Sequence, residues 1–98
     1  MNLEQLVRED FDALIGASFT VPNFAGPALA LRLDATGAAG VGVPGGRAPF
    51  SLVFAGPRAP FLPQGIQHLE HTTLGGLDIF LVPLGPRGEE MLYEAIFS

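Results

Sequence analysis

The chain has 98 residues, a length that allows one domain with one hydrophobic core. Ten acidic residues against five scattered Arg give a net charge of −5, so nucleic acid and anionic membranes are not expected partners. The absence of cysteine excludes disulfides, thiolate catalysis and Cys-based metal sites.

Targeting signals are also missing from the sequence. No basic segment followed by an apolar one opens the chain, and no apolar run approaches the roughly 20 residues that span a bilayer. We therefore expect a cytoplasmic protein without membrane contact. Export by a non-Sec route, or within an assembly, stays open.

Residues 3–14 are the one predicted helix, within an N-terminal helical segment 1–16. Apolar side chains recur there at helical spacing, at Leu3, Leu6, Val7, Phe11 and Leu14. Acidic residues continue into the C-terminal half, where the helix dipole disfavours them, so a break is predicted near Arg8. The apolar stripe must be covered by the chain's own sheet or by a partner.

From residue 17 to residue 97 the apolar period changes to two, which is typical of strands. Gly- and Pro-rich stretches separate the apolar runs and act as turns. The pattern predicts a mainly β fold: a small antiparallel barrel or sandwich of about six strands with one short N-terminal helix, in a single domain over residues 1–98.

The last fifth of the chain reads as a hairpin with a long loop. Residues 77–83 and 91–97 are the predicted strands, and residues 84–90 are rich in turn formers. Both faces are apolar from Ile79 to Val82, a pattern typical of a strand that is covered on both sides. Phe80 and Leu81 are therefore both predicted to lie in the core.

Two Gly- and Pro-rich connections are expected to be loops. Residues 36–48 contain Gly-x-Gly-x-x-Gly from Gly40 to Gly45, but no helix follows, so we expect no nucleotide and no other cofactor. Residues 56–63 hold three Pro and place Phe61 and Leu62 on a stiff loop. That pair is expected to form a lid over the core or, as the alternative, to contact a partner.

Polar candidates for a site lie on the predicted strand at residues 64–73. His68 and Glu70 share one face of it, and His71 points to the other face. Two such groups without a third ligand favour a surface ion pair over a metal site. His71 is expected at the core edge, hydrogen-bonded to backbone. No convergent catalytic set can be assembled, so an enzyme is not expected.

Several stretches match, in order, a pattern of a known family. They are residues 9–11 with Gly16 and Phe19, residues 49–54 with Gly56 and Pro57, residues 62–65, residues 69–71 with Leu74 and Gly75, residues 80–83, and residues 93–95 with Phe97. The chain resembles a family of short bacterial proteins of unknown function. The resemblance implies a stand-alone β-rich domain, assigns no catalytic residue, and implies a phage-tail-like setting.

The leading hypothesis is a non-catalytic structural or protein-interaction module, a subunit of a larger assembly. Its expected partner contacts are Leu3, Leu6, Val7, Phe61 and Leu62, toward a protein partner or a second copy. The alternative is a barrel that binds a small ligand or peptide, with loops 36–48 and 56–63 at its mouth. An enzyme that uses His68 and Glu70 is the third hypothesis.

Overall fold

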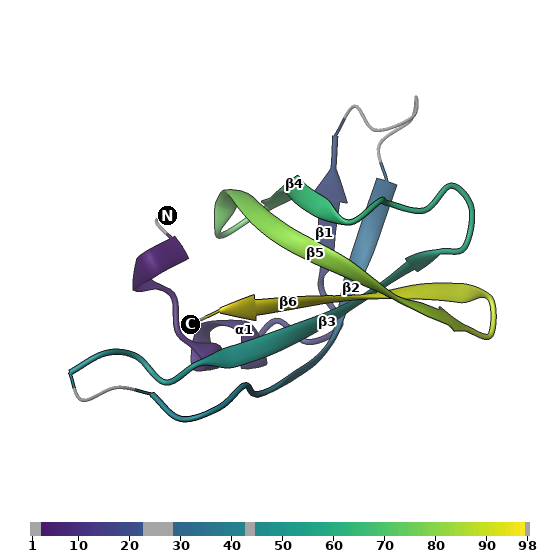
Figure 1. Ribbon diagram of the computed structural model, residues 1–98. Coiled ribbons are helices and arrows are strands. Elements are labelled where there is room, and N and C mark those ends of the chain that lie inside the picture. Colours follow the sequence, from purple (N-terminus) through teal and green to yellow (C-terminus); the bar gives the residue numbers. More distant parts are fainter. Residues whose placement is uncertain (1–2, 23–28, 43–44, 98) are drawn as a thin grey trace.

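Six antiparallel strands close into a barrel in the computed structural model, which describes residues 3–22, 29–42 and 45–97 (Figure 1). The strand order around the barrel is β1-β2-β3-β6-β5-β4. The strands are β1 (Ser18–Val21), β2 (Leu29–Ala38), β3 (Phe50–Pro57), β4 (Gly65–His71), β5 (Gly75–Arg87) and β6 (Glu90–Phe97). The predicted mainly β fold is confirmed, and it is a barrel.

Two three-stranded meanders build the barrel, β1 to β3 and β4 to β6. They join along one side through β3 and β6, whose register runs from Phe50 opposite Phe97 to Pro57 opposite Glu90. On the other side, the described pairing between β1 and β4 is Thr20 opposite Glu70. Across the described residues, no helix combines the length and the hydropathy that crossing a bilayer requires.

The barrel interior is filled by the chain's own side chains. Alternate residues point inward, as the strand period of two requires, and the apolar ones form a single buried cluster. Phe19 and Phe54 meet edge to face in it, with ring centroids 5.3 Å apart. Space is so limited that a methyl group on Gly56 would lie 2.6 Å from Cδ2 of Leu31. A barrel of this size is a packed core.

The N-terminal segment lies against one end of the barrel (Figure 1). A 3-10 helix (Leu3–Gln5) and α1 (Arg8–Asp12) replace the single predicted helix, and the break falls just before Arg8, as predicted. The side-chain Oδ2 of Asp10 accepts the Val7 N–H at 2.8 Å, which begins α1. Phe11 is buried, with its ring centroid 5.8 Å from those of Phe50 and Phe97.

Arg47 fastens the 3-10 helix to this end of the barrel. Its Nη1 donates to the carbonyl oxygens of Leu3 at 2.6 Å and Leu6 at 2.5 Å. Its guanidinium also lies over the Phe50 and Phe97 rings, 5.5 and 5.7 Å from their centroids. Of the apolar stripe, Leu6 and Phe11 are buried in the chain's own core and Leu3 and Leu14 pack against it, whereas Val7 is exposed.

The hairpin between β5 and β6 differs from its prediction. A long loop over residues 84–90 was expected, but β5 continues to Arg87, and only Gly88 and Glu89 separate it from β6. A register shift between Pro83 and Gly85 lets the strand continue through its two Pro residues. Gly88, with φ of +61°, supplies the left-handed conformation that a two-residue turn needs.

The prediction that β5 is covered on both faces is wrong. Ile79 and Leu81 point into the barrel and are buried, whereas Phe80 points outward and is half exposed. A sheet that closes on itself buries one face of every strand and leaves the other outside. Apolar residues on both faces of β5 therefore mark an apolar outer surface and not a second covering layer.

The prediction that loops 36–48 and 56–63 form the mouth of a ligand-binding barrel is also wrong. The connection within residues 36–48 leads into β3, and the connection within residues 56–63 leaves it. The two connections therefore lie at opposite ends of β3, as Figure 1 shows, and they cannot line one opening.

Candidate functional site

Three large apolar side chains lie together on the outside of the barrel, one each on β4, β5 and β6. Ile66, Phe80 and Ile96 are 72, 51 and 63% exposed. Ile66 is the register partner of Phe80, and Phe80 and Ile96 line one hollow of about 220 Å³. We call these three residues the outer row. Large apolar side chains that lie together on a protein surface are characteristic of interaction sites.

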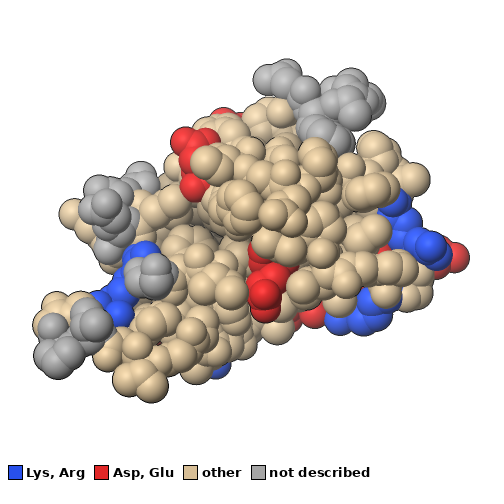
Figure 2. Space-filling view, in the orientation of Figure 1, with Lys and Arg blue, Asp and Glu red and all other residues tan. Residues whose placement is uncertain are grey.

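The outer row is bordered by carboxylates. Asp78 lines the same hollow as Phe80 and Ile96, and Glu94 precedes Ile96 by two residues on the outer face of β6. Glu70 lies further along the outer face of β4. Figure 2 shows the face over β5 and β6 as mostly tan, with red surface in its centre and at its upper left and blue at its left and right margins.

His68 lies between two of these carboxylates. Its Nδ1 is 2.8 Å from Oδ1 of Asp78, and its Nε2 is 3.4 Å from Oε2 of Glu70. Gly76 leaves room for the ring, because a Cβ there would lie 2.8 Å from the His68 Cε1. Hydrogen bonding to Asp78, supported by Glu70, raises the pKa of His68 above its ordinary value. The predicted ion pair between His68 and Glu70 is present, and Asp78 is an additional partner.

This arrangement is unsuited to a metal ion. The two ring nitrogens of His68 point in opposite directions, each toward its own carboxylate, so the three groups do not converge on one point. In the described parts of the chain, no group of three or more His, Cys, Asp or Glu side chains is arranged to hold a metal.

His71 has the role expected for it. Its Nδ1 accepts hydrogen bonds from the backbone N–H groups of Thr73 at 3.0 Å and Leu74 at 3.2 Å. Its ring lies 4.8 Å from that of Phe19, centroid to centroid. Because Nδ1 is the acceptor, the neutral ring carries its proton on Nε2. His71 closes the turn between β4 and β5, on the opposite face from His68.

The five residues expected to contact a partner differ in how far they are buried. Leu6 and Leu62 are buried in the chain's own core, and the Leu62 N–H donates to the Tyr93 hydroxyl at 2.8 Å. Leu3 is partly buried against the same core. Val7 and Phe61 are exposed. Leu6 and Leu62 thus offer no surface to a partner, and the two exposed residues do not adjoin one another in sequence or share an element.

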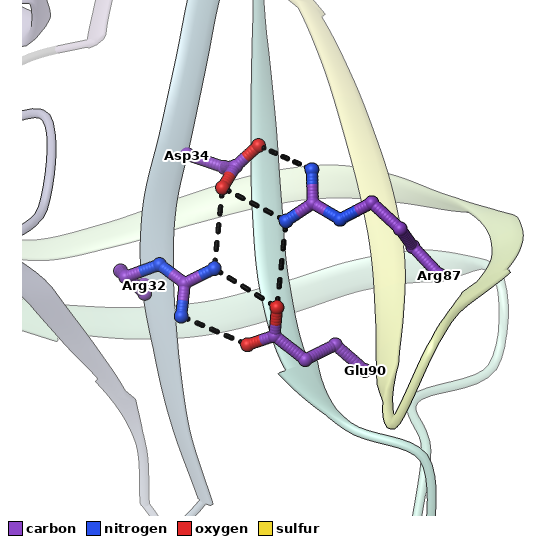
Figure 3. A network of polar contacts seen from close by, with 4 residues as sticks. All are labelled: Arg32, Asp34, Arg87 and Glu90. Atoms are coloured by element: carbon purple, nitrogen blue, oxygen red, sulfur yellow. Dashed lines mark hydrogen bonds and ion pairs between the residues drawn. The ribbon is translucent and has the colours of Figure 1, made fainter.

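A network of four charged residues spans the outside of the barrel near the β5–β6 turn (Figure 3). Arg32 binds Glu90 through two hydrogen bonds of 2.8 and 3.0 Å, and Arg87 binds Asp34 through two of 3.0 Å. These pairings lower the pKa of both carboxyl groups. The network fastens β2 to the β5–β6 turn across the intervening β3.

Two further hollows lie on the surface. One of about 550 Å³ lies between the start of α1, the end of β2 and the residues that lead into β3. Its lining residues include Arg8, Glu9 and Arg47. Arg8 contacts Thr36 and Asp12, and Arg47 holds the 3-10 helix, so both cations already have acceptors. The other hollow, of about 400 Å³, lies at the β1–β4 junction beside Thr20, Glu70 and His71.

Sequence reasoning missed the outer row as a surface. Phe80 and Ile96 lie in strands whose opposite faces are also apolar, so the period-two pattern of those strands could not separate inside from outside. The available signal was Ile66, which shares its face with His68 and Glu70, a polar face that marks the exterior. Pairing Ile66 with Phe80 would have transferred that assignment to β5.

Comparisons with known proteins give one match. The model of the family described as "Domain of unknown function (DUF6916)" matches residues 6–97. No curated protein and no solved structure matches the chain. The matched range includes all six strands and α1.

Proposed function

We propose that this chain, which belongs to the DUF6916 family of domains of unknown function, is a non-catalytic protein-interaction module within a larger assembly. The observation that carries the proposal is the outer row, Ile66, Phe80 and Ile96 on adjacent strands of a closed barrel. The phage-tail-like setting rests on the sequence resemblance alone.

The energetics favour covering this surface. Full burial of one large apolar side chain stabilises a complex by about 1.5–3 kcal/mol relative to exposure. Three such side chains in one contiguous patch can supply the apolar centre that specific interfaces have, with polar groups around it. The strands fix the backbone of all three residues, so the ordering cost of docking on this side falls mainly on side-chain rotamers.

The polar groups nearby support a structural role. His68 directs both ring nitrogens to carboxylates, and His71 accepts two backbone N–H groups through Nδ1. A general base would instead need a free nitrogen within reach of a substrate proton. We accordingly assign both histidines to holding the β4–β5 hairpin.

Two matched double variants test the proposal. Phe80→Ser with Ile96→Ser removes two members of the outer row, and Ile15→Ser with Val41→Ser removes two exposed apolar side chains elsewhere. Each tagged chain is expressed in its native cells, and the lysate is fractionated by size. The parent chain and the Ile15, Val41 variant are expected in a complex heavier than the 10.3 kDa monomer.

The Phe80, Ile96 variant is expected to elute as a monomer that still unfolds cooperatively, because both side chains lie outside the buried core. Elution of the parent chain as a monomer contradicts the proposal. So does equal complex formation by the two double variants.

A further inference from the structure

The charges around the outer row identify the kind of partner that fits it. Asp78, Glu70 and Glu94 lie on the outer faces of the same three strands as the row. Docking of an apolar surface here would bring these carboxylates to the rim of the interface. His68 lies between Asp78 and Glu70, so this face carries three carboxylates against one imidazole. A partner without cations would desolvate that excess of negative charge, which is costly.

The chain itself has few cations to offer to this rim. It contains five Arg and no Lys. Arg32 and Arg87 are held in the four-residue network, Arg8 contacts Asp12 and Thr36, and Arg58 donates to the Gly88 carbonyl. Arg47 borders the hollow beside Phe80, but it also holds the 3-10 helix through the carbonyls of Leu3 and Leu6.

A second copy of the chain therefore fits this face poorly. Two outer rows placed face to face bring the carboxylates of both copies into one interface, where like charges repel. Arg47, the Arg that borders the hollow, is in each copy already bound through Nη1 to the Leu3 and Leu6 carbonyls. The geometry favours a different protein.

We propose that the outer row binds a heterologous protein segment with an apolar centre flanked by Lys or Arg, the cations pairing with Asp78, Glu70 and Glu94. This inference rests on the proposed function and specifies its partner. The hollow of about 220 Å³ between Phe80 and Ile96 would take one apolar side chain of that segment, with Asp78 at its edge.

Photocrosslinking from the centre of the row tests the partner's chemistry. Phe80 is replaced by p-benzoylphenylalanine in the full chain, which is then irradiated in its native cells, and the adduct is sequenced by mass spectrometry. We expect an adduct with a different protein, at a segment that has Lys or Arg next to an apolar residue.

Charge reversal supplies the matched control. Asp78→Lys with Glu94→Lys should lower the adduct yield by about tenfold or more, since like charges across an interface cost several kcal/mol. Glu9→Lys with Glu89→Lys makes the same change in net charge at exposed acids outside the row. This control should leave the yield within about twofold of the parent, because screened charges beyond the interface contribute little.

The outcomes separate this inference from the proposed function. An adduct between two copies of the chain, an adduct at an acidic segment, or equal yields from the two charge reversals would overturn the basic partner. In each of these cases the proposed function survives if the Phe80→Ser, Ile96→Ser variant still loses its complex. The absence of any adduct would also overturn this inference, and the proposed function falls with it if the parent chain elutes as a monomer.

Discussion

At the scale of single residues, the hydroxyl of Tyr93 connects the Pro-rich connection to the core. It accepts the Leu62 N–H at 2.8 Å, and both residues are completely buried. Burial also raises the pKa of Tyr93, since the ionised phenolate would lose its hydration. The bond gives the connection after β3 a fixed position over the core.

Tyr93→Phe should therefore destabilise the fold. It leaves the Leu62 N–H without its acceptor in an apolar site, which costs about 1–3 kcal/mol. Urea denaturation measures the loss, and Phe61→Ala on the same connection is a control that should cost less because Phe61 is exposed. A Tyr93→Phe variant as stable as the parent would show that water replaces the hydroxyl.

His68 makes the stability of the fold depend on pH, and the direction of its pKa shift determines the sign of that dependence. Its pKa is raised in the folded chain, mainly by Asp78. The stability that it contributes is thus fully present below its unfolded pKa and is lost as the pH rises through the folded value. NMR titration should show the His68 pKa falling in Asp78→Asn, with a smaller fall in Glu70→Gln. An unchanged pKa in Asp78→Asn would contradict the assigned contact.

At the scale of elements, two adjacent residues of β5 lie on opposite sides of the barrel wall, with Leu81 pointing inward and Phe80 outward. Leu81→Ala empties a fully buried site and should cost about 2–5 kcal/mol. Phe80→Ala trims a half-exposed side chain and should cost less than about 1.5 kcal/mol. Chemical denaturation of the two variants measures the difference, and equal losses would mean that β5 is covered on both faces.

The sequence allowed the strands and their turns to be predicted, because alternation and Gly or Pro punctuation are local signals. The break before Arg8 was also predictable, from acids placed against the helix dipole. The extent of β5 could not be predicted. Its Pro residues fit the strand only through the register shift after Pro83, and that shift depends on pairing with β6. Barrel closure is likewise a property of pairings between distant strands, and it determines that Phe80 faces outward.

At the scale of the whole molecule, closure of the barrel limits how the chain can associate. Every strand has a neighbour on each side, so association through the described barrel would use faces in preference to open strand edges. The candidate polar residues His68, Glu70 and His71 were predictable from their residue types. The outer row was not, since its members come from three strands that only the fold brings together.

The central claim is that the face around Phe80 is covered in the native setting. Hydroxyl-radical footprinting of the unmodified chain tests it, with Phe61 as an internal reference, because Phe80 and Phe61 are 51 and 53% exposed. In the purified chain both rings should oxidise to a similar extent. In native cell extract the oxidation of Phe80 should fall severalfold while that of Phe61 stays unchanged. Equal oxidation of Phe80 in the two samples, or protection of Phe61 in its place, would contradict the account.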